Sequence, residues 1–399
     1  MHAQTTDTMR HPRHRGTLGF VAALCGCLTG GLLPVASAVA AEATTPYAVV
    51  EIGAKGVKGY LFDMDRAARD PACSVDNDAY LKCIAPVTLP QNNCNPLTDV
   101  PEFKDTAKAV QGFMDDFTKQ GIPANHIYIV GSSSLGDGLR HDLLEQQIAK
   151  LVTPTPANPL GFVNVVQESE FGFKGVLGML PERWRRIRTL EAVTIDIGSG
   201  NTKGAFQTSA GPLVDFSVNF GTRSATQAIK AAQQKPDSLR KAADGWRLSV
   251  LEPQLHSEID NKQAIASRNR VYLIGGAVWA LATHTHPEDS TSKFPRIDAK
   301  SIDVLMDRAL SSNAEEDLCN DARKRKYPEV GKVCETFNPE QLVGGLTILK
   351  ALSEQLGFAS NHKVVFFFRD SLYAWPLGYI ADKLQVRAPE VHPVQKHPS

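Results

Sequence analysis

The sequence is informative first in what it lacks. It has no charge bias, because 43 basic and 43 acidic side chains give a formal net charge of +0. Without a basic surplus the chain has no general attraction for polyanions, so we expect no nucleic acid partner. Beyond residue 41 no apolar run reaches about 18 residues, which argues against a membrane span in the mature chain. No Cys-x-x-Cys spacing occurs, so a cysteine-based zinc site is not expected.

The first 41 residues have the pattern of a secretory signal peptide. Three arginines between positions 10 and 15 precede an apolar stretch over residues 18–41 that is rich in Ala, Leu, Val and Gly. Small residues suited to cleavage end at Ala38 or Ala41. The segment therefore predicts a periplasmic or secreted mature chain. A rival interpretation takes Cys27 as a lipidated cysteine that would anchor the chain to a membrane.

The cysteines that follow this segment are expected to form disulfides in an oxidising compartment. We predict a bond between Cys319 and Cys334, which flank a basic stretch. Two of Cys73, Cys83 and Cys94 are expected to pair as well, and which two stays open.

One pattern occurs twice in the chain. Residues 48–62 read AVVEIGAKGVKGYLF and residues 193–206 read VTIDIGSGNTKGAF. Each copy is an apolar run, an acid, Ile-Gly, four further residues and Lys-Gly. Each is typical of a β-strand that delivers a carboxylate into a glycine turn. The agreement at fixed offsets indicates a duplicated domain.

Periodicity predicts an α/β protein, because strand-like and helical segments alternate. Strand-like runs occur at 47–52, 58–63, 126–131, 162–166, 192–197, 203–207, 213–218, 271–275 and 363–368, and helical patterns cover roughly 101–120, 136–152, 167–180, 222–235, 276–284, 301–311, 338–357 and 371–385.

These segments divide into two domains, with the seam near residues 181–190. We predict an N-terminal domain over 46–188 and a C-terminal domain over 189–378, with a terminal helix and tail over 379–399. Residues 66–100 are rich in Pro, Asn and Cys and are interpreted as an insertion in the first domain.

The two glycine turns are candidate phosphate-binding loops, because successive backbone N–H groups in such turns form anion sites. The second turn offers Gly198, Ser199, Gly200, Asn201 and Thr202. Asp196 before it could hold a hydrated Mg²⁺. A hairpin turn with an incidental acid explains the same segment.

The first turn is less well equipped. It offers Gly53, Ala54, Lys55 and Gly56, and Glu51 stands in the place of the shorter Asp. The Lys55 cation could bind phosphate by its charge, and Glu51 is a second candidate metal ligand.

Two further segments have candidate functional residues. Gly275 and Gly276 lie between an apolar strand and a helix, where N–H groups could bind a distal phosphate or leave room for a base. Glu168 and Glu170 lie at a strand-to-helix junction, where a carboxylate could take a proton from water. An acid in the first turn of a helix is the simpler interpretation.

Taken in the order in which they occur along the chain, these segments resemble the actin/Hsp70/sugar-kinase superfamily and, within it, the Ppx/GppA exopolyphosphatase/guanosine pentaphosphate phosphatase family. A further matching segment is the serine-rich run over 127–140. The resemblance covers about residues 47–385. It implies two ribonuclease-H-like domains with a cleft between them, bound Mg²⁺, and attack of water on a terminal phosphoanhydride.

When the family's functional residues are matched to this chain position by position, the resemblance implies that Glu170 is the catalytic base and that Glu168 is the second candidate. It places Asp196 on the metal side and Arg223 near the phosphates. Extracellular apyrases are close cousins that share a signal peptide and disulfides.

The chain also departs from the family. The family's first turn resembles D-x-G-S-N-S, so both hydroxyls are lost here, and its second resembles D-x-G-G-G-S-T-E, so Lys203 replaces an acid. We expect an exported phosphoanhydride hydrolase acting on polyphosphate or a nucleoside polyphosphate. The alternatives are an apyrase-like nucleoside phosphatase and an actin-like protein that binds nucleotide or polyphosphate without turnover. Association into a homodimer stays open.

Overall fold

The computed structural model describes residues 46–54, 56–62, 64, 87–88, 96–99, 103–136, 139–153, 155–178, 188–209, 211–233, 239–290 and 292–384. These residues belong to one compact unit, Thr44–Ser399. The expected signal peptide with Cys27, the cysteines at 73, 83 and 94, Lys55 and the C-terminal tail from residue 385 lie outside the described residues.

The first sheet has five strands in the order β3 (Val87–Thr88), β2 (Gly56–Phe62), β1 (Tyr47–Gly53), β4 (Ile127–Gly131) and β5 (Gly161–Phe162). Strand β1 pairs antiparallel with β2 and parallel with β4. It is buried on both faces, as its nearly continuous apolar sequence predicts for a central strand.

The second sheet repeats this topology. Its order is β10 (Val364–Phe367), β9 (Arg270–Ile274), β6 (Ala192–Ile197), β7 (Thr202–Gln207) and β8 (Leu213–Val218). Strand β6 pairs antiparallel with β7 and parallel with β9, as β1 does with β2 and β4. Each strand of the first sheet therefore has a counterpart in the second, which agrees with the duplication inferred from sequence.

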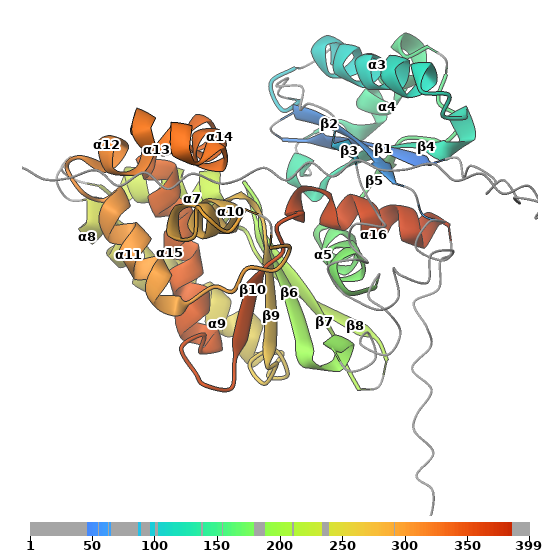
Figure 1. Ribbon diagram of the computed structural model, residues 1–399. Helices are drawn as coiled ribbons and strands as arrows, with labels where there is room; N and C mark the ends of the chain where they lie inside the picture. The colour runs from blue at the N-terminus through green and yellow to red at the C-terminus, as the bar shows by residue number, and fades with distance from the viewer. Residues whose placement is uncertain are drawn as a thin grey trace, which may run out of the picture. The chain divides into compact units, whose positions relative to one another are not determined.

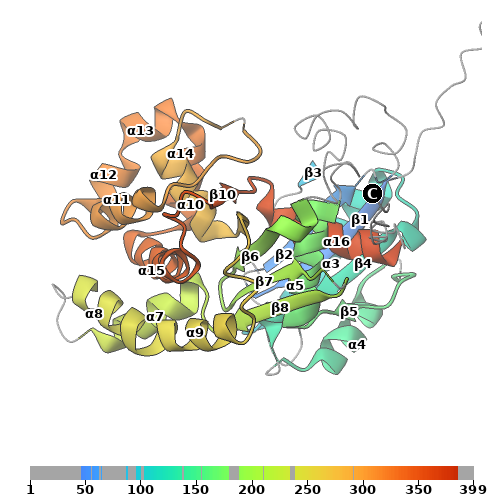
Figure 2. The same ribbon diagram turned by 90° about the horizontal axis from the view of Figure 1, so that it is seen from below.

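Helices cover the outer face of each sheet (Figures 1 and 2). Helices α3 (Lys104–Lys119) and α4 (His141–Leu151) share a hydrophobic core with β1, β2 and β4. A larger core lies between the second sheet and its helices. These helices are α7 (Thr222–Ala232), α8 (Leu239–Trp246), α9 (Glu252–Asp260), α10 (Gly276–Thr285), α11 (Ala299–Ala309) and α15 (Pro339–Leu356).

Three short helices complete this half: α12 (Ala314–Cys319), α13 (Asp321–Lys326) and α14 (Pro328–Thr336). Within the described part of the chain, no helix combines the length and apolar character needed to cross a membrane.

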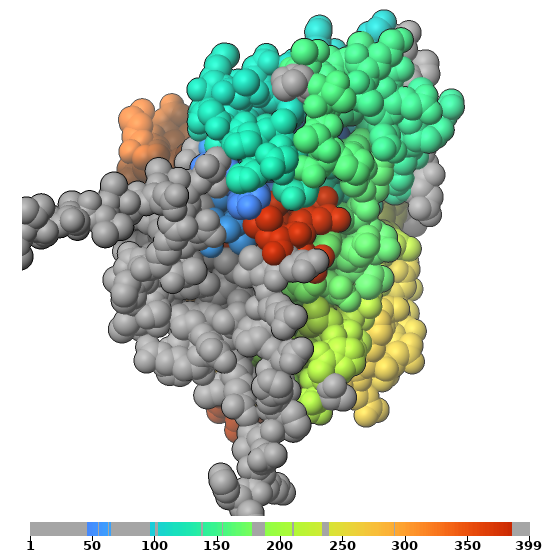
Figure 3. All heavy atoms as spheres, turned by 90° about the vertical axis from the view of Figure 1, so that its right-hand side faces the viewer, coloured from blue at the N-terminus to red at the C-terminus, as the bar shows by residue number. Residues whose placement is uncertain are grey.

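The two sheets are joined through a central pair of helices (Figure 1). Helix α5 (Val165–Phe173) follows β5 and continues as a π-helical segment (Lys174–Gly178), and α16 (Ala374–Lys383) follows β10. Both contribute to a third hydrophobic core, which also contains inner-face residues of both sheets. In space-filling view, α16 lies between the helices of the N-terminal half and the strands of the second sheet (Figure 3).

Glycines allow the backbones of these two helices to touch. A Cβ added at Gly378 would lie 1.9 Å from the Phe171 carbonyl oxygen, and one at Gly175 would lie 1.7 Å from that of Ala374. No side chain fits at such distances, so the close contact of α5 and α16 depends on both positions.

The expected elements were found with four differences, the first of which is the two-residue strand β3, which was not predicted. Residues 162–166 do not form a full strand, because Asn164 caps α5 through Gln167 and the helix starts at Val165. Helices α8 and α9 were not predicted, since Gly245 and a π-helical turn interrupt their period. Helices α12 to α14 were missed because they are short, charged and separated by caps.

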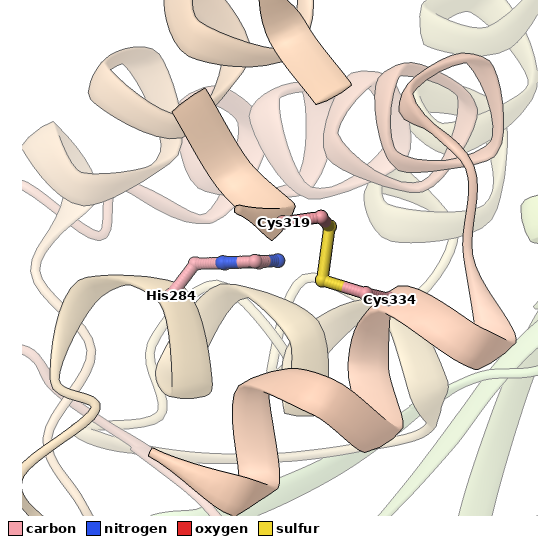
Figure 4. Close-up of side chains that lie close together, drawn as sticks. All are labelled: His284, Cys319 and Cys334. Atoms are coloured by element: carbon pink, nitrogen blue, oxygen red, sulfur yellow. A yellow bond between two sulfur atoms is a disulfide. The ribbon is translucent and has the colours of Figure 1, made fainter. Parts of the chain in front are cut away.

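The expected disulfide between Cys319 and Cys334 is present and joins α12 to α14, with Cα atoms 5.8 Å apart. The imidazole of His284, from α10, lies beside it (Figure 4). His284 is only 2% exposed, and neither ring nitrogen has a hydrogen-bond partner among the described residues. Burial, with the nearby Arg323 and Arg308 charges, lowers the pKa of His284 from 6.5 to about 4.

We predict that Gly378→Ala lowers the free energy of unfolding by at least about 1–3 kcal/mol, because the new methyl group would overlap backbone atoms of α5. The matched control is Gly112→Ala in α3, which has open space at this position. The control should be neutral or stabilising, since Ala favours a helix over Gly by about 1 kcal/mol. Urea unfolding of both variants measures the difference, and equal effects would contradict the close-contact account.

His284 is also expected to make stability depend on pH. Its pKa is lower in the folded chain than in the unfolded one, so the unfolded chain is protonated first as the pH falls. The stability that the neutral ring contributes is complete above pH 6.5 and decreases toward pH 4, by roughly 3 kcal/mol at that point. His284→Leu should lose this part of the pH dependence. Parallel stability curves for the two proteins between these pH values would show the prediction to be wrong.

Candidate functional site

A cavity of about 430 Å³ lies where the duplicated hairpins come together. Its walls come from the β1–β2 turn, the β6–β7 turn, the serine turn after β4, the start of α10 and side chains of α14. Gly53, Ala54, Gly56, Gly198, Ser199, Asn201, Gly275, Gly276, Glu51, Asp196 and Glu168 all line it. The structure thus brings most of the predicted site residues to one place.

The repeated lysine faces the repeated acid in both hairpins. Glu51 is opposite Lys58 in the β1–β2 register, and Asp196 is opposite Lys203 in β6–β7. Lys58 Nζ lies 2.8 Å from Glu51 Oε1, and Lys203 Nζ lies 2.9 Å from Asp196 Oδ2. Cross-strand neighbours of opposite charge stabilise a hairpin, and here both pairs point into the cavity.

Lys203 lies at the centre of a buried ionic network. Its ammonium also lies 2.9 Å from Glu168 Oε1 and donates to Asn201 Oδ1 at 3.1 Å. Burial alone would lower the pKa of Lys203, but the carboxylates of Asp196 and Glu168 outweigh burial and raise the pKa above its ordinary value. The side chain, 3% exposed, is therefore a permanent buried cation.

Glu168 connects the two halves of the molecule. Its Oε2 accepts from the Ser133 backbone N–H at 2.8 Å, on the first sheet's side, while Oε1 faces Lys203 in the second sheet. Burial raises the pKa of Glu168, but the Lys203 charge and the Ser133 hydrogen bonds lower it below 4.5 overall. The Asn201 amide donates to Ser133 Oγ at 3.3 Å and adds a second link between the halves.

Glu51 is also fully engaged. Its second oxygen accepts from the Tyr60 hydroxyl at 2.8 Å, and that hydroxyl lies 2.9 Å from the Leu372 carbonyl oxygen. Burial and the neighbouring Glu51 charge raise the pKa of Tyr60, so its proton stays in place.

The serine turn supplies hydroxyls that the first glycine turn lacks. Ser134 Oγ accepts from the Ala54 backbone N–H at 3.2 Å and lies 2.6 Å from Ser132 Oγ. Both serines line the cavity. Sequence reasoning singled out this turn as a family match but named no site residue in it.

The second turn is held in shape by the start of α7. The Thr222 and Arg223 N–H groups donate to the Gly198 and Ser199 carbonyl oxygens, each at 2.9 Å. A Cβ at Gly221 would lie 2.5 Å from the Gly198 oxygen, so only glycine allows this contact. The Gly198 N–H donates to the Asn201 carbonyl oxygen at 3.0 Å, so the N–H groups that this turn can offer to an anion are those of Ser199, Gly200 and Asn201.

The diglycine has its own geometric requirement. Gly275 has φ +106°, and a Cβ there would lie 2.3 Å from the Ile197 carbonyl oxygen. Both the left-handed backbone and the close approach favour glycine at this position.

Four predicted site residues do not line the cavity. The Glu170 side chain is not among the lining residues, and it lies two positions after Glu168 on a helix, so the two side chains leave different faces. Gly200 and Arg223 are exposed, and Thr202 is buried with its hydroxyl donating to the Phe220 carbonyl oxygen at 2.7 Å. Of the two candidates for the catalytic base, Glu168 lines the cavity and Glu170 does not.

The residues at this cavity do not fit the expected Mg²⁺ as they are arranged. Glu51 and Glu168 have all their carboxylate oxygens in contacts with ammonium, hydroxyl or N–H groups, and Asp196 has one oxygen against Lys203. Within the described ranges, three or more His, Cys, Asp or Glu side chains approach within 4.8 Å of one another only at His284 and the disulfide. We therefore assign no step to a metal ion.

We predict that Lys203→Met costs about 3–5 kcal/mol of stability, because it leaves the buried Glu168 carboxylate and the part-buried Asp196 carboxylate without their cation. Lys58→Met is the matched control. It removes a lysine from the same place in the other hairpin, but that side chain is 20% exposed and Glu51 keeps Tyr60. Thermal unfolding should show a much larger loss for Lys203, and equal losses would contradict the central role of this ammonium.

Comparison with known proteins bears on the fold. No protein-family model and no curated protein matches the sequence. Solved structures do match. An exopolyphosphatase from Cytophaga hutchinsonii is 14% identical, with a TM-score of 0.55, over 86% of this chain and 99% of its own. The Aquifex aeolicus member of the Ppx/GppA family is 11% identical, with a TM-score of 0.57 over 86% and 99%.

An exopolyphosphatase-like protein is 12% identical, with a TM-score of 0.59 over 85% of this chain and 99% of its own. These likenesses, together with the repeated sheet topology, establish the fold that the sequence predicted. The chain has the duplicated, ribonuclease-H-like α/β fold of the Ppx/GppA proteins.

Proposed function

We propose that the cavity binds a linear chain of phosphoryl groups and that the protein hydrolyses its terminal phosphoanhydride. The observation that carries this proposal is the meeting of both glycine turns, the diglycine and Glu168 around one cavity. Opposed turns can hold successive phosphates from two sides through backbone N–H groups. The start of α10 adds its positive dipole end at the same cavity.

Glu168 is the residue that would act on water. It is ionised at neutral pH, and it is held on two sides by Lys203 and Ser133. Each carboxylate oxygen can accept more than one hydrogen bond, so Glu168 can still orient a water molecule. Phosphoryl transfer depends mainly on positioning and charge stabilisation, which such a rigid carboxylate supports.

The cavity favours an inorganic phosphate chain over a nucleotide. A Cβ at Gly276 would lie 2.7 Å from the Phe337 ring. This ring therefore covers the face of the diglycine on which room for a nucleobase was expected. A nucleobase stacked on this face would have to displace the Phe337 ring, which is part of the hydrophobic core. The exopolyphosphatases among the similar folds support the same ligand class. Nucleoside polyphosphates remain the alternative substrates.

One observation favours a second function, binding without turnover. The low pKa of Glu168 makes it a weak base, and both its oxygens are already engaged. A carboxylate so firmly held could serve only to shape the site. Release of phosphate decides between hydrolase and binding protein.

We also propose that residues 1–41 direct export of the protein. The disulfide between Cys319 and Cys334 supports an oxidising compartment, where such bonds form and persist. Anchoring through Cys27 and pairing into a homodimer remain additional proposals.

The test is phosphate release from tripolyphosphate, long-chain polyphosphate, ATP and GTP. We expect the inorganic chains to be the better substrates and Glu168→Gln to lose at least about a hundredfold in rate, the usual scale for a general base. Glu170→Gln, on the same helix but outside the cavity lining, is the matched control and should retain the wild-type rate. Loss of activity in the Glu170 variant alone would overturn the assignment. Binding of tripolyphosphate without phosphate release would favour the second function.

A further inference from the structure

The ammonium groups of Lys58 and Lys203 lie against the carboxylates that line the proposed phosphate site. Three carboxylates, those of Glu51, Glu168 and Asp196, line the proposed phosphate site and would repel a phosphate chain if left bare. Lys58 contacts the first at 2.8 Å, and Lys203 contacts the other two at 2.9 Å each. The negative charge nearest the ligand is thus largely neutralised from within the protein.

The arrangement occurs in both halves. Each lysine faces its acid across its hairpin and follows that acid by seven residues. An accidental surface pair would not be expected at the same place in two hairpins that otherwise differ in turn sequence. The duplicated position indicates a shared role at the shared cavity.

The remaining lining charges are also balanced. The fourth acid, Glu329, accepts from the Trp279 indole at 2.8 Å and lies 3.5 Å from Lys332 Nζ. The fourth base, Arg369, donates to the backbone carbonyl oxygens of Ser292 and Asp289. Acidic and basic side chains along the described walls are equal in number, so the cavity has no negative surplus to draw in a dication.

We propose that this cavity binds phosphate chains without a divalent metal, with Lys58 and Lys203 supplying the positive charge that a metal ion would otherwise provide. The identity of the ligand rests on the function proposed above. The metal-free form of the ligand then binds through backbone N–H groups, while the lysines shield it from the carboxylates. A Mg²⁺ complex of the same chain would instead bring a dication toward the Lys203 ammonium.

The first experiment uses the wild-type protein and tripolyphosphate. Calorimetric titration in EDTA and in Mg²⁺, at matched ionic strength, should give dissociation constants that agree within about threefold, a difference well below 1.4 kcal/mol. Binding that is at least about tenfold tighter with Mg²⁺ would overturn the inference and leave the proposed function standing. Absence of binding in both buffers would overturn the proposed function and the inference with it.

The second experiment asks whether a lysine replaces a metal ion. Lys58→Met is chosen because its loss should be tolerated better than that of Lys203. The substitution removes the cation beside the Glu51 carboxylate. Tripolyphosphate binding in EDTA should therefore weaken by about tenfold or more, and Mg²⁺ should restore it. Lys332→Met removes the same charge from α14, where the side chain is 68% exposed. This control should lose affinity to the same degree in both buffers.

Rescue by Mg²⁺ in the Lys58 variant but not in the Lys332 variant would support the replacement of a metal by ammonium. Equal behaviour of the two variants would show that Lys58 acts only as a general positive charge. A titration of Mn²⁺ followed by electron paramagnetic resonance, without phosphate, gives an independent readout. Wild-type protein should show no tight site, and the Lys58 variant should gain one.

Discussion

The buried ammonium of Lys203, held between Asp196 and Glu168, is the interaction on which the site depends. Asp196 belongs to the second sheet and Glu168 to the helix that leaves the first, so one cation joins both halves of the duplicated fold. Removing charges from water is costly, and only close pairing with further hydrogen bonds offsets that cost. Asn201 and Ser133 provide those bonds here. The network therefore ties the second hairpin to α5 and to the serine turn after β4.

The packing of α5 against α16 also holds this ionic network in place. The contact of α5 and α16 through Gly175 and Gly378 places Glu168 at the cavity, because the residue lies on α5 one turn from its start. The central hydrophobic core then holds both helices against the two sheets. Charge pairing at the cavity and glycine contacts in the core thus act on the same helix. A change in either is expected to alter the spacing of the turns.

Sequence reasoning recovered the part of this design that is repeated. Two matching hairpins, each with an acid, a glycine turn and a lysine at fixed offsets, predicted the duplicated α/β fold and most of the cavity wall. It assigned the base to Glu170 by matching positions to the family that the chain resembles, with Glu168 in reserve. The contacts of Glu168 with Lys203 and Ser133, which hold its carboxylate at the cavity, join elements far apart in the chain.

The role of the lysines could not be seen in the sequence for a different reason. The offset between Asp196 and Lys203 shows that they are cross-strand neighbours once the hairpin is known. The approach of Glu168 to the same ammonium is a contact between elements far apart in the chain, set by tertiary packing alone. Phe337 covers the diglycine from the end of α14, a helix that sequence did not predict. Such contacts decide whether a site holds a metal ion, a nucleobase or neither.

The most direct test of this account is a crystal structure of the protein with tripolyphosphate, grown in the presence of Mg²⁺. The account predicts phosphates between the 53–56 and 198–201 turns, with Lys203 still bridging Asp196 and Glu168 and no metal ion on either carboxylate. A Mg²⁺ ion bound to Asp196, with the Lys203 ammonium displaced from the carboxylates, would contradict it.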